Sequence, residues 1–133
     1  DAIDAAHGTY VRLTEDEAVK ALAPDTLIAT DGKHWIAISA PHSSSSAVEY
    51  LHLSVVPHLN YGKVAHHHSV EGAVGASGHG TVAVLLPAAD YALLDRAMQE
   101  GRLLPEKATS FQPKPSLGVL MRSVDSELMT PAT

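Results

Sequence analysis

The chain has 133 residues, 45% of them hydrophobic and 18% charged, which fits one domain with a core of its own. Acidic residues outnumber basic ones by 15 to 9, and the resulting formal charge of −6 argues against an extended nucleic-acid-binding surface. Cysteine is absent, which excludes disulfides, thiolate nucleophiles and cysteine-containing zinc sites.

No apolar run approaches the roughly 20 residues that a membrane-spanning helix needs, and no signal peptide is visible. We therefore expect a soluble protein without a membrane partner, in a compartment that the sequence does not define. Because the sequence starts at Asp1 and its first methionine is Met98, we also expect a processed product, a mature secreted form or an excised domain.

Strand patterns dominate the first part of the chain. Residues 26–30 and 34–39 flank Asp31-Gly32-Lys33, and an Asp-Gly connection predicts a β-hairpin because glycine tolerates positive φ. Before this hairpin, Thr14 and Glu17 form a capping-box pattern that predicts a helix to about residue 22. The strands predicted along the whole chain are residues 9–13, 26–30, 34–39, 47–56, 81–86 and 117–122.

The strand predicted at residues 47–56 carries the first histidine of interest. Apolar and polar residues alternate from Tyr50 to Val55, so this strand has an apolar face and a polar face that presents His52 and Ser54. The acidic side chains Glu49, Glu71 and Asp90 are expected to be solvated or helix-end charges.

Helices and strands alternate in the second half. Residues 63–76 predict a helix weakened by two glycines, and residues 87–100 predict an amphipathic helix that ends at Gly101. Between them, a flexible turn delivers His79 to the start of the strand at residues 81–86.

This order of elements predicts the α+β class, with a mixed β-sheet of five or six strands and two or three packed helices. Residues 1–122 are predicted to form a single globular domain, and residues 123–133 are predicted to be a tail.

Two short strings share one form, His52-Leu53-Ser54-Val55 and His79-Gly80-Thr81-Val82. On strands, a histidine and the hydroxyl two residues later point the same way, so each string presents an imidazole beside a hydroxyl. Two such pairs across a cleft suit phosphodiester cleavage. One neutral histidine removes a proton from the attacking oxygen, and one protonated histidine supplies a proton to the leaving oxygen.

These strings resemble the paired His-x-Ser/Thr-x-apolar motifs of the 2H phosphoesterase family, whose members act on 2′,5′-linked or cyclic nucleotide phosphates and RNA ends without a metal. The resemblance implies that His52 and His79 are catalytic and that Ser54 and Thr81 hold the phosphate. It also implies a small nucleotide or an RNA-end phosphate as the substrate.

A second resemblance rests on the order of elements from residue 49 to the last predicted strand, which is similar to type II peptidyl-tRNA hydrolase-like domains. In that family a Gly-Lys loop after the first strand lies near the active site, which implies a substrate-binding role for Lys63. Tyr61, two residues earlier, is a candidate to stack on a base at the rim of the same site.

The three consecutive histidines at 66–68 raise a metal hypothesis, because neutral imidazole is a common ligand of zinc and nickel. On a strand His66 and His68 share a face, whereas on a helix adjacent side chains fan out by about 100°. We predict a function without a cofactor, with a zinc or nickel ion at His66 and His68 as the alternative.

Two functions follow from these patterns. The first is a metal-independent hydrolase or phosphoesterase that acts on a nucleotide or RNA-end phosphate through His52 and His79. The second is a non-enzymatic structural or protein-interaction module, in which the histidines are surface and packing residues and the strands serve assembly. The two histidine strings favour the enzyme, whereas the acidic charge and the lack of a basic patch favour the module.

Overall fold

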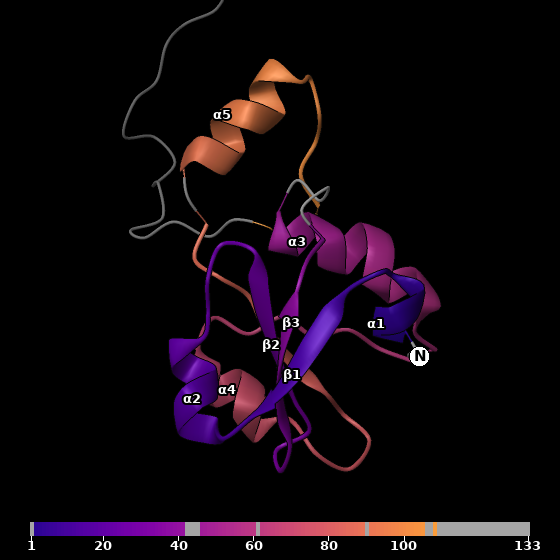
Figure 1. Cartoon of the computed structure of the whole chain (residues 1–133), viewed down its shortest axis with the longest axis vertical. Coiled ribbons are helices and arrows are strands. Elements are labelled where there is room, and N and C mark those ends of the chain that lie inside the picture. Colours follow the sequence, from indigo (N-terminus) through magenta and orange to yellow (C-terminus); the bar gives the residue numbers. More distant parts are fainter. Residues whose placement is uncertain (1, 42–45, 61, 90, 106–107, 109–133) are drawn as a thin grey trace, which may run out of the picture.

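The computed structural model describes residues 2–41, 46–60, 62–89, 91–105 and 108. Within these residues, four strands form one sheet in the order β1-β3-β2-β4, and every neighbouring pair is antiparallel (Figure 1). The strands are β1 (Thr9–Leu13), β2 (Thr26–Thr30), β3 (Trp35–Ser39) and β4 (Ala83–Leu85).

The α+β class is confirmed, but the mixed sheet of five or six strands is not. The described sheet is antiparallel and has four strands. Of the two remaining predicted strands, residues 47–56 are helical, and residues 117–122 lie outside the described residues together with the predicted tail at 123–133. The helical elements are α1 (Ala2–Ala5), α2 (Glu15–Lys20), α3 (Ala47–Tyr50), the π-helix η1 (Leu51–Val55), the 3-10 helix η2 (Val56–His58), α4 (Val70–Gly75) and α5 (Tyr91–Gln99).

The hairpin β2–β3 forms as predicted from Asp31-Gly32-Lys33. Gly32 adopts φ +87°, a conformation that side chains with a Cβ rarely take. The Asp31 carboxylate accepts hydrogen bonds from the backbone N–H groups of Lys33 (2.9 Å) and His34 (2.7 Å). The turn is therefore held by its own side chain.

Helices cover both faces of the sheet. On one face, residues that include Leu27 and Ile38 pack against Tyr50 and Val55 of the segment α3–η1, with α1 beside them. On the other face, Ile28, Trp35 and Leu85 pack against Ala18 of α2 and against partly buried residues of α4. In Figure 1, α5 lies beyond one end of the sheet near α3, whereas α2 and α4 lie toward the other end.

The strand predicted at residues 47–56 is wrong, because residues 47–58 run as consecutive helical elements from α3 through η1 to η2. Ser46 is the N-cap, and its hydroxyl oxygen accepts a hydrogen bond from the Glu49 backbone N–H (3.2 Å). The alternation of leucines does not match burial, since Leu53 is 70% exposed and Val55 is 4% exposed. Residues 47–50 are all buried and the next buried residue is Val55, a pattern that does not have the two-residue period of a strand.

The remaining predicted helices form, but two of them are shorter than predicted. The capping box at the start of α2 is confirmed, because the Thr14 backbone N–H donates to the Glu17 carboxylate (2.9 Å). The helix predicted within residues 63–76 forms only at α4, and the helix predicted at residues 87–100 is shortened to α5. The strand predicted at 81–86 contracts to the three residues of β4.

Candidate functional site

His52 and Ser54 occupy the π-helix η1 and not a strand. Residues two positions apart on a helix of this kind project to nearly opposite sides, so the two side chains do not share a face. The prediction that His52 and Ser54 stand side by side relied on strand geometry, and it is wrong because the segment is helical. Their roles as catalytic and phosphate-holding residues stay predictions.

The environment of His52 is defined by burial and by one neighbouring histidine. The side chain is partly buried, and burial lowers the pKa of His52 below its usual value of 6.5. The charge of His66 lowers this pKa further. His52 is therefore predominantly neutral near pH 7, a state in which an imidazole can accept a proton.

His79 lies in a turn between α4 and β4. Gly78 and Thr81 exchange two backbone hydrogen bonds (2.8 and 2.9 Å), and His79 adopts φ +52°, which is uncommon for a residue with a side chain. The turn contacts the β2–β3 hairpin, since a Cβ on Gly78 would lie 3.5 Å from the Asp31 carbonyl oxygen. Both His79 and Thr81 are exposed. The histidine whose charge acts on His52 is His66 rather than His79.

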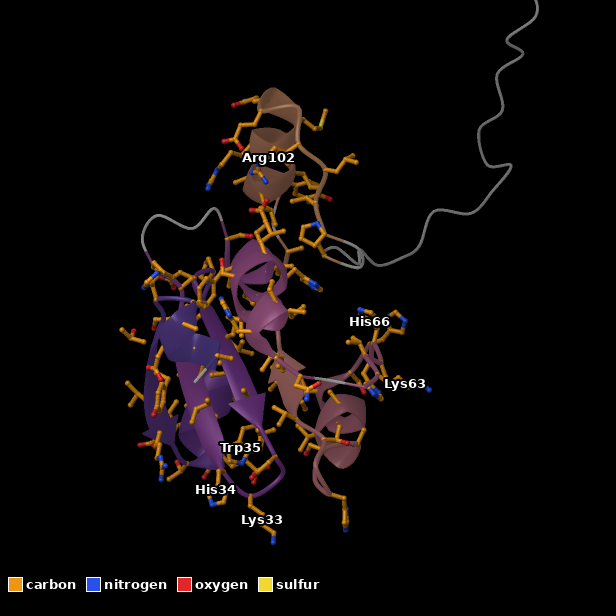
Figure 2. The ribbon with its side chains drawn as sticks, turned by 90° about the vertical axis from the view of Figure 1, so that its right-hand side faces the viewer. Lys33, His34, Trp35, Lys63, His66 and Arg102 are labelled. Carbon is orange, nitrogen blue, oxygen red and sulfur yellow. The ribbon has the colours of Figure 1, made fainter. Side chains whose placement is uncertain are left out.

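The other predicted site residues lie in the segment between η2 and α4. Lys63, His66 and His68 are exposed, and Figure 2 shows Lys63 and His66 on one loop, well away from His34 at the hairpin end. Tyr61 lies outside the described residues. No group of three or more histidine, aspartate or glutamate side chains in the described part of the chain is placed to hold a metal ion. The proposal of zinc or nickel at His66 and His68 stays a prediction.

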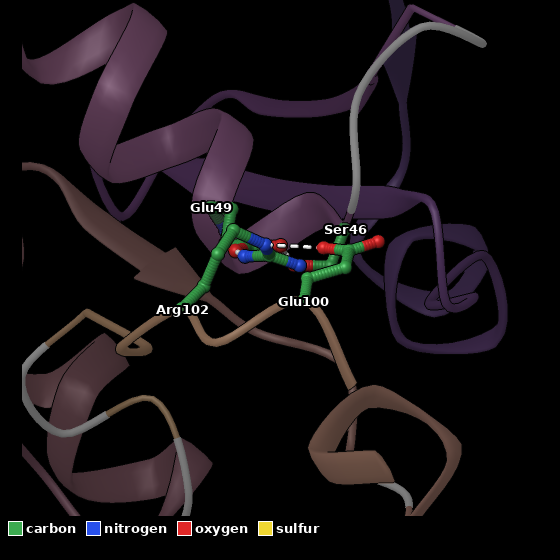
Figure 3. Close-up of polar contacts among 4 residues, drawn as sticks. All are labelled: Ser46, Glu49, Glu100 and Arg102. Atoms are coloured by element: carbon green, nitrogen blue, oxygen red, sulfur yellow. Dashed lines mark hydrogen bonds and ion pairs between the residues drawn. The ribbon is translucent and has the colours of Figure 1, made fainter. Parts of the chain in front are cut away.

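A polar cluster that the sequence analysis missed joins α3 to the end of α5 (Figure 3). Glu49 was predicted to be a solvated or helix-end charge. It lies in the first turn of α3, but it is not solvated, since it is 3% exposed and forms an ion pair with Arg102. Arg102 also contacts Glu100, and the Ser46 hydroxyl donates to Glu49 (3.1 Å). The Ser-x-x-Glu spacing of Ser46 and Glu49 is a helix-start signature, and it was the available signal for a helix here.

Two surface hollows lie elsewhere on the described structure. One is lined by residues around α3 and the start of α5, including Ser46, Val48, Leu93 and Arg96. The other lies at one end of the sheet and is lined by His7, Thr9, Asp25, Ser39, Ala40 and Pro41. Neither hollow includes a residue predicted to be catalytic, so these hollows do not support the paired-histidine site.

The most open feature of the sheet is the outer edge of β1. This strand pairs only with β3 among the described strands, in an unbroken register from Thr9 opposite Ser39 to Leu13 opposite Trp35. Four of its five residues are exposed, with Val11 at 63%. Figure 1 shows β1 as the front strand of the sheet. An edge strand of this kind presents unpaired backbone N–H and C=O groups to any extended segment.

No described helix is long and apolar enough to cross a membrane. A comparison of this sequence and structure with protein-family models, curated proteins and solved structures found no match.

Proposed function

We propose that this chain is a non-enzymatic interaction module that binds an extended segment of a partner protein along the outer edge of β1. One observation carries the proposal: β1 is an exposed edge strand whose outer side is paired by no other described strand. An added strand gains a ladder of main-chain hydrogen bonds, and its alternate side chains meet those of β1.

The composition of β1 favours pairing with a further strand, because it has few of the features that block such pairing. Natural edge strands are commonly blunted by proline, charged side chains or a β-bulge. Residues 9–13 contain no proline, their pairing with β3 has no bulge, and Arg12 is their single charge. Threonine, tyrosine and valine are also strong strand formers. The opposite edge is a weaker docking site, since β4 has three residues and both Ala83 and Leu85 are buried.

The proposal is tested by selecting twelve-residue peptides against the folded protein and mapping them by NMR. Selected peptides should alternate apolar and polar residues and should shift the backbone amide signals of residues 9–13. A lysine on the edge repels an incoming strand, so Val11→Lys should weaken binding at least about tenfold. Val82→Lys is the matched control because Val82 is similarly exposed (60%) and lies outside β1.

Two results would reject the edge as the binding site. Selected peptides could map to other residues, such as those of α5, or they could bind Val11→Lys as tightly as they bind the wild type. In either case the interaction surface lies elsewhere or the chain is not an interaction module of this kind.

A histidine-dependent hydrolase is the second candidate, and one observation favours it. Burial and the charge of His66 both lower the pKa of His52, so His52 would act as the proton acceptor with His66 as its partner. Lys63 on the same loop would supply a positive charge for a phosphate. This arrangement replaces His79 by His66 as the partner of His52.

The hydrolase is tested on 2′,3′-cyclic nucleotides and short RNA, with and without chelator. Chelator-resistant activity that is lost in His52→Ala and His66→Ala and retained in His79→Ala would support the pair proposed here. Loss in His52→Ala and His79→Ala, with retention in His66→Ala, would support the pairing predicted from the sequence. Absence of activity in the wild type would reject the hydrolase.

A further inference from the structure

We infer that the extended segment bound by β1 is β1 of a second copy of this chain, paired antiparallel about a two-fold axis at Val11. The inference rests on the proposed role of the β1 edge and names its occupant. A two-fold interface is isologous, so the same five residues must complement themselves.

The side chains of β1 meet this requirement in one register. With Val11 opposite the partner's Val11, Tyr10 faces the partner's Arg12 and Thr9 faces the partner's Leu13. The Tyr10–Arg12 and Thr9–Leu13 pairings each occur twice, and no like charges face each other. The guanidinium of Arg12 then lies beside an aromatic ring, which attracts a cation. Tyr10 is 45% exposed, so its ring is accessible for this contact.

Neighbouring registers that keep the same faces together are less complementary. Centring the axis on Arg12 sets the two arginines opposite each other, and like charges in directly opposed positions are destabilising. Centring it on Tyr10 sets Arg12 opposite the partner's Gly8, which offers no side chain. Charge and side-chain contact therefore select the register centred on Val11.

The elements that flank β1 leave room for this pairing. Helix α1 packs on the sheet face that carries Leu27 and Ile38, and α2 packs on the face that carries Ile28 and Trp35. Pairing about an axis perpendicular to the sheet keeps equivalent faces together. The two copies of α1 then share one face and the two copies of α2 share the other. Because α1 precedes β1 and α2 follows it, antiparallel pairing sets the two copies of each helix at opposite ends of the paired strands.

The dimer is expected to be weak and dependent on salt. A five-residue ladder is a small interface, so association should appear between about 10 µM and 1 mM. Each copy carries a formal charge of −6, and screening of this repulsion should strengthen the dimer as salt rises.

Disulfide cross-linking tests the register directly, because the natural chain contains no cysteine. In Val11→Cys, the two introduced thiols lie directly opposite each other, where Cα atoms are about 4.5–5.5 Å apart and a disulfide can form. Mild oxidation should therefore convert Val11→Cys into a covalent dimer. Tyr10→Cys should remain largely monomeric because Tyr10 faces the partner's Arg12, and Val82→Cys controls for cross-linking by random collision.

Sedimentation equilibrium of the unmodified chain gives the second test. Wild type and Val82→Lys should show the same concentration-dependent dimer, and Val11→Lys should shift its midpoint at least about tenfold upward. A monomer at every concentration would overturn the inference. A dimer that survives in Val11→Lys, or equal cross-linking of all three cysteine variants, would overturn it too.

The experiments distinguish failure of the dimer from failure of the proposed function. If the chain is monomeric and selected peptides still shift the β1 amide signals, the edge binds another partner and only the dimer fails. If the chain is monomeric and no selected peptide depends on Val11, both fail.

Discussion

Arg102 forms an ion pair with the buried carboxylate of Glu49, a residue 53 positions earlier in the chain. The end of α5 sets up this contact. Gly101 adopts φ +62°, and the Arg102 backbone N–H donates to the Ala97 carbonyl oxygen (2.9 Å), which closes the helix and turns the chain toward α3. The pair therefore fastens α5 to the body of the protein.

Removal of the Arg102 side chain should destabilise the fold, because it leaves the Glu49 carboxylate buried without its cationic partner. Arg102→Ala is expected to lower the free energy of unfolding by about 2–3 kcal/mol, less than for a fully buried pair since water reaches the arginine. Urea unfolding followed by circular dichroism measures the change.

Two further variants separate charge burial from lost packing. Arg12→Ala removes an exposed arginine and should change the free energy of unfolding by less than about 0.5 kcal/mol. The double variant Glu49→Gln/Arg102→Met removes both charges and should recover most of the stability lost in Arg102→Ala. A double variant as unstable as the single one would show that burial of the carboxylate is not the cause.

The helical course of residues 47–58 predicts opposite behaviour for two nearby apolar residues. Leu53→Ala should cost less than about 0.5 kcal/mol because Leu53 is exposed, whereas Val55→Ala should cost about 2 kcal/mol because it leaves a cavity beside Tyr50 and Leu27. Thermal and urea unfolding compare the two. In a strand, both side chains would lie on the apolar face, and equal losses would contradict the helix.

The pKa of His52 should respond to His66 and not to His79. Burial and the charge of His66 both lower the pKa of His52, and burial is the larger cause. In His66→Ala this pKa should therefore rise but remain below 6.5, because burial still opposes the charged form. NMR titration of the His52 ring protons measures it directly, and His79→Ala is the matched control. A rise in His79→Ala that equals or exceeds that in His66→Ala would place His79 beside His52 and contradict this arrangement.

The β2–β3 turn should lose stability at low pH. The side chain of His34 and the backbone N–H groups of His34 and Lys33 hold the pKa of Asp31 well below its usual value of 3.8. Because the pKa of Asp31 is lower in the folded state than in the unfolded state, ionised Asp31 stabilises the fold at pH values above the unfolded-state pKa. This stabilisation is lost as pH falls below about 3.8.

Asp31→Asn keeps the shape of the side chain and removes its titration. The stability difference between wild type and Asp31→Asn should shrink as pH falls below about 4. Urea midpoints between pH 2.5 and pH 7 measure it. A difference that does not change with pH would mean that the Asp31 carboxylate is not preferentially charged in the fold.

Local signals in the sequence predicted local structure well. The Asp-Gly connection and the capping box at Thr14 depend on residues two or three positions apart, and both appear as expected. The segment at residues 47–56 failed because short apolar runs fit both a strand and a buried helix. There the spacing of Ser46 and Glu49 indicates a helix start, whereas the alternation of apolar and polar residues indicates a strand. The structure agrees with the spacing.

Long-range relationships were beyond the reach of the sequence. Residues 9–13 were correctly predicted to be a strand, but the edge position of β1 depends on the hairpin inserting β3 between β1 and β2. Arg102 likewise gave no sign of its pairing with Glu49, because the two meet only after α3 and α5 have packed. For the same reason the sequence could not show that His66, and not His79, acts on His52.

The attachment of α5 also sets the order in which parts of the molecule open. Its buried contribution is confined to Leu93 and Ala97, whereas β2 is buried from Leu27 to Thr30 and bonded on both sides. Segments with few buried contacts exchange their amide hydrogens through partial opening, at lower free energy than global unfolding. Helix α5 should therefore separate from α3 as one cooperative unit, with the Glu49–Arg102 pair setting how often it does so.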